Sequence, residues 1–177
     1  CLVGSEMCIR DRLKCLKESG IRYENTEVCA LLTGSEEAGL RGATAFTKRH
    51  KGENKDVETY IIAFDTMRDY DYMTIYHRDM TGMVKNSPEV VALLDEACND
   101  PDVNHPLPHG VVPFGASDAA AFSRGGFKAA AVAGQNPKYA PYYHNRRDTP
   151  DQMIPETFAL GLDIALAAIE AFDRDQK

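Results

Sequence analysis

The chain has 177 residues, of which 44% are hydrophobic, and this length and composition suit one compact domain with a single core. The formal net charge of -7 argues against a nucleic-acid or anionic-membrane partner, because either would be repelled by the average field of the protein. No uncharged apolar run reaches about 18 residues, so the sequence predicts no transmembrane segment.

The first twelve residues differ in character from the rest of the chain. The stretch LVGSEMCIRD, Leu2 to Asp11, back-translates to CTC GTG GGC TCG GAG ATG TGT ATA AGA GAC. This resembles one reading frame of a transposase-based sequencing-library adapter. We therefore predict that residues 1–12 are a non-native, adapter-derived segment and that residues 13–177 are the C-terminal portion of a single domain. The compartment stays open, because a signal peptide would have preceded Leu13.

The cysteines predict neither disulfides nor a structural zinc site. Cys1 and Cys8 belong to the adapter-like segment, and the spacings of Cys15, Cys29 and Cys98 match no paired framework and no CxxC motif. Each of these three thiols is expected to be buried or half-buried.

Four short, mostly apolar runs have the length of strands: 28–32, 59–64, 73–76 and 129–133. The basic stretch 48–55 contains glycine and is followed by acids, so we interpret it as a solvated loop.

Two helices are predicted in the second half of the chain. In the first, Ser87 is the expected N-cap, Pro88 occupies the first turn, and Glu89 follows. Its apolar face comprises Val90, Val91, Leu94 and Cys98. The last helix is expected to bury a stripe made of Phe158, Leu162, Ala165, Ile169 and Phe172. Alternating strands and helices predict an α/β fold with a mostly parallel central sheet flanked by helices.

Acidic residues follow the first two predicted strands. Glu36 and Glu37 come just after the first, and Asp65 comes just after the second. In an α/β sheet the ligand crevice lies beyond the carboxyl ends of the strands, and carboxylates gathered there repel one another unless a cation binds. A divalent metal is the simplest such cation. His144, with Asp148 four residues later to orient it, is a candidate nitrogen ligand.

Each signal has an ordinary structural alternative. Glu36 and Glu37 could occupy the first turn of a helix capped by Ser35, where the helix dipole favours carboxylates. Asp65 could be a turn or cap residue, and His144 a hydrogen-bonded surface histidine. The order and spacing of all four residues favour a shared site.

Four segments occur in the order found in a known family: TGSEEAGLRGA, AFDTM, FGASDAAAF and YYHNRRDTPDQM. Together they resemble the zinc-dependent exopeptidases of the bacterial leucyl aminopeptidase type, which have paired zinc ions and include the glutaminyl cyclases as a divergent branch. The resemblance extends from about Leu13 to the C-terminus. It implies the phosphorylase/hydrolase-like zinc exopeptidase fold and makes residues 13–177 the C-terminal portion of a peptidase catalytic domain.

The resemblance also implies residue roles. Glu36 would be the general base, taking a proton from a water shared by two zinc ions and passing it to the leaving amine. Glu37, Asp65 and His144 would be zinc ligands. The implied substrate is a peptide with a free N-terminus. Contacts to the substrate or to the ligands are implied for Ser117, Asp118, Asp148, Tyr139, Tyr142 and Tyr143, although the tyrosines could equally be ordinary loop aromatics.

Two departures from the family pattern affect this interpretation. Family members carry an upstream histidine and a bridging aspartate as further ligands, and the chain holds no native residues before about Leu13 to supply them. We therefore expect the chain as written to bind zinc weakly and to be inactive, whereas the intact gene product would be a peptidase. In addition, Ala119 follows Asp118 where many relatives have histidine.

Other functions fit less of the sequence. A serine hydrolase could use Ser117 with His144 and either Asp148 or Asp151, but GASDA lacks the GxSxG pattern. A glutaminyl cyclase with one zinc and a non-catalytic, peptidase-like interaction domain are further alternatives. GxxxxGK, GxGxxG and HExxH are absent, so nucleotide chemistry and helix-borne zinc proteolysis have no support.

Overall fold

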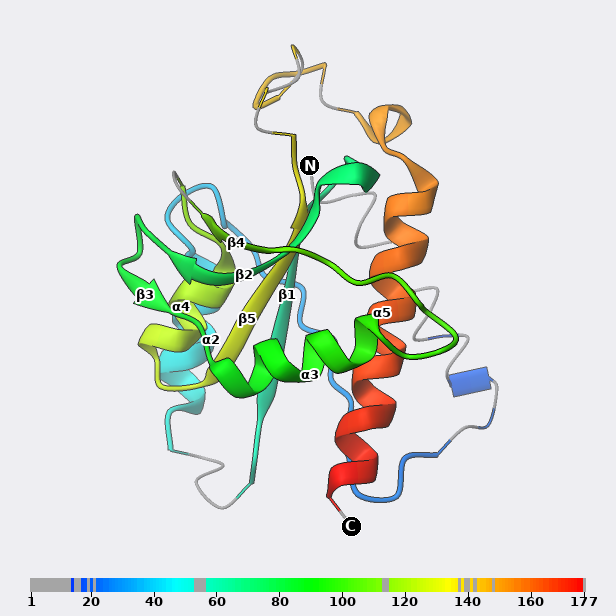
Figure 1. Cartoon of the computed structure of the whole chain (residues 1–177). Helices are drawn as coiled ribbons and strands as arrows, with labels where there is room; N and C mark the ends of the chain where they lie inside the picture. The colour runs from blue at the N-terminus through cyan, green and yellow to red at the C-terminus, as the bar shows by residue number, and fades with distance from the viewer. Residues whose placement is uncertain are drawn as a thin grey trace.

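A computed structural model of the chain shows an α/β arrangement (Figure 1). It describes residues 14, 17, 18, 20, 22–52, 57–112, 115–136, 138, 141, 143–147 and 149–176. The described elements are, in chain order, α2 (Arg41–His50), β1 (Tyr60–Met67), η1 (Tyr70–Tyr72), β2 (Met73–Asp79), β3 (Val84–Lys85), α3 (Pro88–Cys98), β4 (His109–Val112), α4 (Asp118–Arg124), β5 (Lys128–Gly134), η2 (Pro150–Gln152) and α5 (Pro155–Asp175).

The described strands form one sheet with the order β1-β5-β2-β3, and β4 pairs with β2. Strands β1 and β5 are parallel, as are β2 and β4, whereas β2 runs antiparallel to β5 and β3. The expected α/β class with a helix-flanked central sheet is confirmed. Its described part is a mixed rather than a mostly parallel sheet, because β5 pairs with an antiparallel neighbour.

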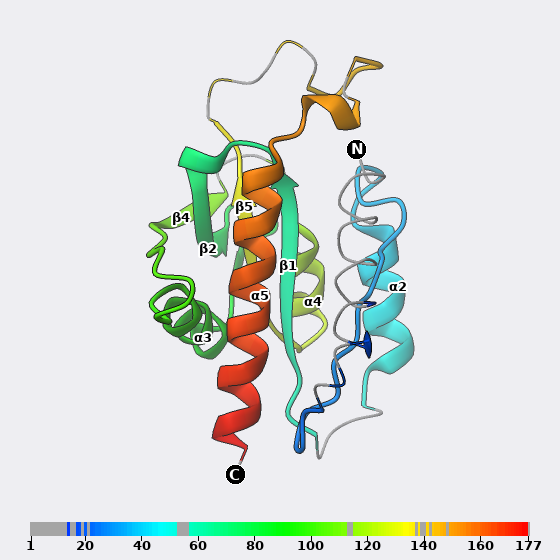
Figure 2. The ribbon, with the colours of Figure 1, turned by 90° about the vertical axis from the view of Figure 1, so that its right-hand side faces the viewer.

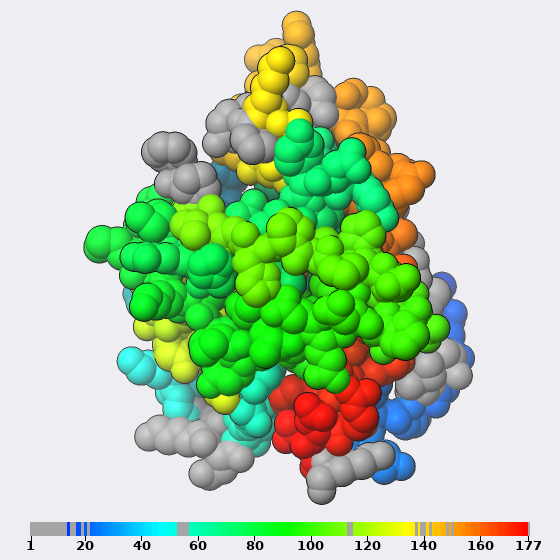
Figure 3. Space-filling view, viewed as in Figure 1, coloured from blue at the N-terminus to red at the C-terminus, as the bar shows by residue number. Residues whose placement is uncertain are grey.

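Helices cover both faces of the sheet, as the edge-on view of Figure 2 shows. On one face α3 and α5 pack over a cluster that includes Ile75, Leu94 and Ile164, each fully buried. On the other face α2 and α4 pack over a smaller cluster rich in alanine. In the space-filling view, α3 and the segment after it cover the front of the molecule, and residues after β5 project at its top (Figure 3).

Three of the four predicted strands are confirmed, as β1, β2 and β5. The strand predicted at 28–32 is wrong: these residues have no regular structure, and Leu31 and Leu32 are 41% and 52% exposed. An apolar run specifies a strand only if a neighbouring strand accepts its hydrogen bonds, and none of the described strands pairs with it. The loop predicted at 48–55 is also partly wrong, since Lys48 to His50 form the last turn of α2. Basic side chains are favoured there by the helix dipole. Residues 53–56 lie outside the described residues.

Helix α3 matches its prediction, with Ser87 as N-cap residue and Pro88 in the first turn. Its four predicted core residues are buried. Helix α5 is confirmed, but its predicted stripe is displaced. The fully buried positions are Thr157, Leu160, Gly161, Ile164, Ala168 and Ala171, whereas the predicted residues are half-buried. No helix among the described residues is long and apolar enough to span a membrane.

The two described cysteines differ sharply in environment. Cys98 is buried in α3, and burial raises the pKa of its thiol to about 11, whereas Cys29 is exposed. The expectation of a buried or half-buried thiol is therefore confirmed for Cys98 and wrong for Cys29, and Cys15 lies outside the described residues. Because the thiolate is the reactive form, Cys98 is expected to resist iodoacetamide at pH 8 until the protein unfolds, whereas Cys29 reacts in the native state. Peptide mass spectrometry with and without denaturant measures both rates, and equal native labelling would contradict the packing of α3.

Candidate active site

The segment between Thr33 and α2 forms consecutive turns. The backbone N–H of Leu40 donates to the carbonyl of Glu36 at 2.7 Å, and that of Arg41 donates to Ser35 at 3.2 Å. Helix α2 begins only at Arg41 and has Leu40 as its N-cap residue. Glu36 and Glu37 therefore precede the helix, and the alternative in which Ser35 caps a helix that contains both acids is wrong.

The segment that carries Glu36 and Glu37 packs closely against the first turn of α2. The N–H of Gly42 donates to the carbonyl of Gly34 at 2.9 Å. A Cβ atom at Gly42 would stand 2.5 Å from the Gly34 oxygen and 2.6 Å from its nitrogen, which no side chain tolerates. The glycine spacing in TGSEEAGLRG thus lets the first turn of α2 touch the backbone that leads to the two glutamates.

Carboxylates from three parts of the chain gather at this end of the sheet. Burial, together with the negative charges of Asp65, Glu37 and Asp118, raises the pKa of Glu36 to about 7. Burial also raises the pKa of Asp65, against the effect of a 3.0 Å hydrogen bond from the Thr66 hydroxyl. Asp65 lies within β1 rather than beyond its end. Such a group of acids favours a bound cation.

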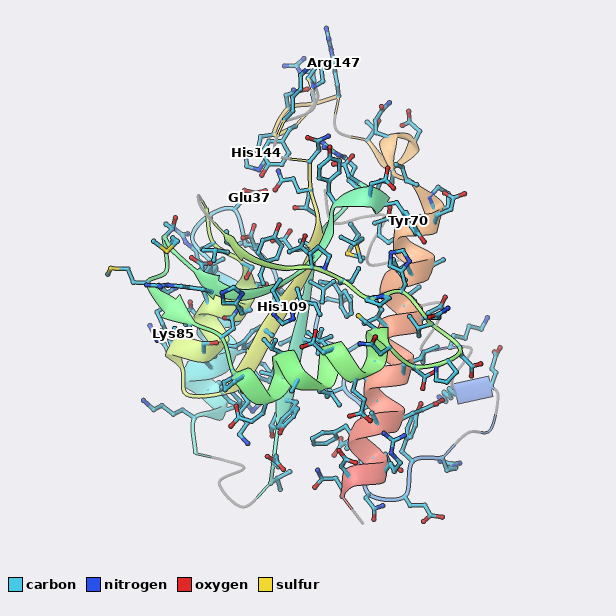
Figure 4. All side chains as sticks on the ribbon, in the orientation of Figure 1. Glu37, Tyr70, Lys85, His109, His144 and Arg147 are labelled. Atoms are coloured by element: carbon cyan, nitrogen blue, oxygen red, sulfur yellow. The ribbon has the colours of Figure 1, made fainter. Side chains whose placement is uncertain are left out.

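His144 contacts the same group from the far end of the sequence. Its Nε2 lies 3.0 Å from Oε1 of Glu37, and its ring stacks on Tyr143 with centroids 3.9 Å apart. Figure 4 shows Glu37 and His144 facing each other above the sheet, with Arg147 farther out. The loop that carries His144 is anchored where it leaves β5, because the N–H of Asn136 donates to Asp69 at 2.8 Å.

Asp118 joins the site from the first turn of α4. Its Oδ2 accepts a 2.5 Å hydrogen bond from the Thr33 hydroxyl, and its Oδ1 is buried with no hydrogen-bond partner among the described residues. Burial raises the pKa of Asp118. The preceding Ser117 is 4% exposed, and its hydroxyl likewise has no partner within the described part of the chain. A buried, unpaired carboxylate oxygen is costly unless a ligand satisfies it.

Strained backbone accompanies these residues. Ser35, Thr66 and His144 have φ values of 56°, 41° and 56°, in the left-handed region that side chains disfavour. Each is a site residue or the direct neighbour of one. Such conformations cost on the order of 1–3 kcal/mol and persist where the surrounding structure enforces them. Met83 and Asn104 share this conformation outside the site, so the strain alone does not mark a functional position.

The residues present supply the donor types that zinc prefers. Two carboxylates, Glu37 and Asp65, and the imidazole of His144 provide oxygen and nitrogen ligands. The crowded negative charge and the unpaired Asp118 oxygen also fit a cation or a cationic ligand. In the described residues, however, no three His, Cys, Asp or Glu side chains are close enough together to hold a metal ion. The donor chemistry fits zinc, and Glu37 and His144 contact each other directly.

Most of the predicted site residues lie near one another at this end of the sheet. Two further residues beside them, Thr33 and Tyr76, were not predicted from the sequence. Glu36, Glu37, Asp65, Asp118, Ser117, His144 and Tyr143 lie at or beside this end of the sheet. Asp148, Tyr139 and Tyr142 lie outside the described residues. The missed residues are Thr33, through its bond to Asp118, and Tyr76, whose pKa is raised by burial and by the charge of Asp65. No sequence signal distinguished either one.

The serine hydrolase alternative gains no support. Ser117 is buried, and His144 contacts Glu37. A nucleophile with its general base within hydrogen-bond reach is therefore not formed by these two residues.

Solved structures with the same fold are peptidases and a cyclase. An aminopeptidase from Aneurinibacillus sp. strain AM-1 matches with a TM-score of 0.61 and 24% identity, over 77% of this chain and 31% of its own. BSAP, a zinc aminopeptidase from Bacillus subtilis, matches with a TM-score of 0.62 and 18% identity, over 77% and 34%. A glutaminyl cyclase from an Acidobacteriales bacterium matches with a TM-score of 0.67 and 14% identity, over 95% and 59%.

The chain thus spans about a third of the length of these two aminopeptidases. Comparison with curated protein sequences gives no match. The family model described as Peptidase family M28 matches residues 9–169, which is most of the sequence. The suspected relationship to zinc-dependent exopeptidases is thereby confirmed at the level of the family. The chain belongs to peptidase family M28.

Proposed function

We propose that this chain contributes to a two-zinc site that hydrolyses N-terminal peptide bonds, with Glu36 as general base and Glu37, Asp65 and His144 as zinc ligands. The observation that carries the proposal is the 3.0 Å contact between Glu37 and His144, beside the carboxylates that raise the pKa of Glu36. Membership of peptidase family M28 supports peptide hydrolysis. A neighbouring fold described as a zinc aminopeptidase supports both the metal and the position of cleavage.

Glu36 has the properties of a general base for this reaction. Its pKa of about 7 allows it to accept a proton from water near neutral pH and to return that proton to the leaving amine. Zinc bound at the neighbouring ligands would polarise the scissile carbonyl and make the attacking water more acidic. The turns before α2 position Glu36 and Glu37, and Glu37 contacts His144. Glu37 and His144 would hold the zinc, and Glu36 would then act beside it without being a ligand.

The same charges favour a substrate with a free N-terminus. The α-amine of a peptide is positively charged near neutral pH, and the potential of Glu36, Asp65 and Asp118 attracts that group. The buried Oδ1 of Asp118, which has no hydrogen-bond partner among the described residues, would be an acceptor for this amine in the complex. An N-acetylated peptide lacks the charge and should be a poor substrate, which separates an aminopeptidase from an endopeptidase.

A glutaminyl cyclase is the second candidate, because a cyclase structure covers nearly the whole chain. Such an enzyme would release ammonia from an N-terminal glutamine and would need one zinc. Metal content per chain and the mass of the product distinguish the two reactions: hydrolysis adds one water to a cleaved peptide, whereas cyclisation removes ammonia from an intact one.

Zinc affinity tests the proposed ligands directly. In a tag-free preparation, Glu37→Gln, Asp65→Asn and His144→Ala should each weaken zinc binding at least about tenfold, because each removes a carboxylate or imidazole ligand. Competition with a chromophoric chelator measures the affinity. His109→Asn is the matched control, since this exposed histidine pairs with Asp95 on α3.

Unchanged zinc affinity in the His144→Ala protein would remove that residue from the site. Equal losses in the His144→Ala and His109→Asn proteins would show that surface histidines bind the metal non-specifically. Loss in the three ligand variants alone supports the proposed site.

A further inference from the structure

A fully buried carboxylate lies next to the site but outside the proposed machinery. Asp79, the last residue of β2, is 0% exposed. Its Oδ1 accepts a 2.6 Å hydrogen bond from the N–H of Gly82, and its Oδ2 accepts a 3.1 Å bond from the N–H of Ser117. A carboxylate with both oxygens engaged by backbone donors from separate segments joins those segments rigidly.

One of these segments leads directly to the site. Ser117 is the N-cap residue of α4, and Asp118 is the first residue of that helix. Asp118 in turn accepts the 2.5 Å hydrogen bond from Thr33, three residues before Glu36. Two hydrogen-bonded links therefore connect the turn after β2 with the segment that carries the glutamates.

Packing reinforces the first of these links. A Cβ atom at Gly82 would lie 3.0 Å from the Cβ of Ala120 and 3.1 Å from Oδ1 of Asp79, so the turn sits tightly against α4. Ala119 and Ala120 are fully buried on the same helix. In Figure 1 the β2–β3 connection lies beside α4, in agreement with their contacts.

We propose that Asp79 is a positioning residue for the active site: by holding the N–H groups of Gly82 and Ser117, it fixes the first turn of α4 so that Asp118 meets Thr33. The segment with Glu36 and Glu37 is thereby held in register with Asp65. The catalytic consequence rests on the proposed function, whereas the positioning itself does not.

The substitution Asp79→Asn tests this role with little change in shape. An amide offers one oxygen acceptor and one NH₂ donor, so one of the two backbone N–H groups must face another donor. The zinc affinity of the folded chain is expected to fall about tenfold. The backbone amide resonances of Ser117, Asp118 and Thr33 are expected to shift in two-dimensional NMR spectra, and the amides of Gly82 or Ser117 to exchange faster with solvent.

Leu94→Ala is the matched control. Leu94 is fully buried in the cluster on the opposite face of the sheet, so its truncation lowers stability without touching α4. Zinc affinity and the Thr33 and Asp118 resonances should stay unchanged in this variant at a temperature where both proteins are folded. If Asp79→Asn does not fold, Gly82→Ala presses the same turn against Ala120 and should shift the same amides.

The two parts of the proposal fail separately. If Glu37→Gln, Asp65→Asn and His144→Ala all leave zinc affinity unchanged, the proposed function fails, and the amide shifts still decide whether Asp79 positions α4. If zinc binds but Asp79→Asn changes neither its affinity nor the Thr33 resonance, the positioning role is overturned. Equal effects of Asp79→Asn and Leu94→Ala would also overturn it, because they would reflect general loss of stability.

Discussion

Replacing Glu36 by glutamine should lower kcat by about 10²–10⁴-fold, because glutamine keeps the shape of the side chain but cannot accept a proton. Zinc affinity should change less than about twofold, since Glu36 is proposed to stand beside the ligands rather than to be one. The measurement combines hydrolysis of aminoacyl p-nitroanilides with chelator competition, in a form of the protein that shows turnover. Substrate affinity is expected to stay similar, which places the loss in the chemical step.

Two controls sharpen this result. Glu37→Gln should lower zinc affinity as well as turnover, whereas Glu36→Gln should lower turnover alone. This difference in zinc affinity separates a ligand from a general base. Glu96→Gln, on the exposed side of α3 where Glu96 pairs with Arg174, should change neither quantity. A Glu36→Gln protein that loses zinc in proportion to its activity would make Glu36 a ligand and leave the base unassigned.

Elements whose signals are local could be predicted from the sequence. Ser87, Pro88 and apolar residues at helical spacing predict helix α3, and a continuous run of small apolar residues predicts β5. Both are confirmed because periodicity and burial act within one segment, although the Ser87 hydroxyl donates to Glu89 rather than to a backbone N–H of the helix. The strands β3 and β4 were missed, since they are short and depend on pairing with β2, a partner that no local pattern reveals.

The displaced stripe of α5 has a physical reason. The face that meets the sheet contains Gly161, whose missing side chain allows close approach to Met67, together with Thr157, whose hydroxyl bonds to the carbonyl of Arg68. The larger Phe158 and Phe172 pack at the margin of the cluster. The buried face therefore combines Leu160 and Ile164 with small residues, and the aromatic residues of the predicted stripe lie at its border.

The site, like the fold, has parts that the sequence predicts and parts that it does not. The carboxylates and His144 were predicted from residue types in a family-like order, and the structure brings Glu37 to His144 and gathers the acids around Glu36. The bond from Thr33 to Asp118 could not be predicted, because it joins segments far apart in sequence through a common residue type. The expected strand before the glutamates was wrong, yet Glu37 contacts His144 and Glu36 lies among the other acids, because the turns before α2 place them there.

Those turns make Gly42→Ala the second substitution with a large expected effect. In a helix interior, alanine is more favourable than glycine by about 1 kcal/mol. In an ordinary helix, the change would therefore stabilise the protein. Here the new Cβ would stand 2.5 Å from the backbone of Gly34. Overpacking of this kind costs about 1–3 kcal/mol, and rigid backbone cannot rotate away as a side chain can. The segment that carries Glu36 and Glu37 must therefore move.

We expect a Gly42→Ala protein to be less stable to urea and to bind zinc at least about tenfold more weakly. Gly161→Ala in α5 is the matched control, because its Cβ would meet mainly the terminal methyl of Met67, which lies at the end of a flexible side chain. That variant should keep its zinc affinity. A Gly42→Ala protein with raised stability and unchanged zinc binding would show that the glutamate segment does not rest on α2. Loss of stability in the Gly42→Ala protein, together with a gain in the Gly161→Ala protein, would support the prediction. It would show that glycine is required where the backbone of α2 supports the segment with Glu36 and Glu37.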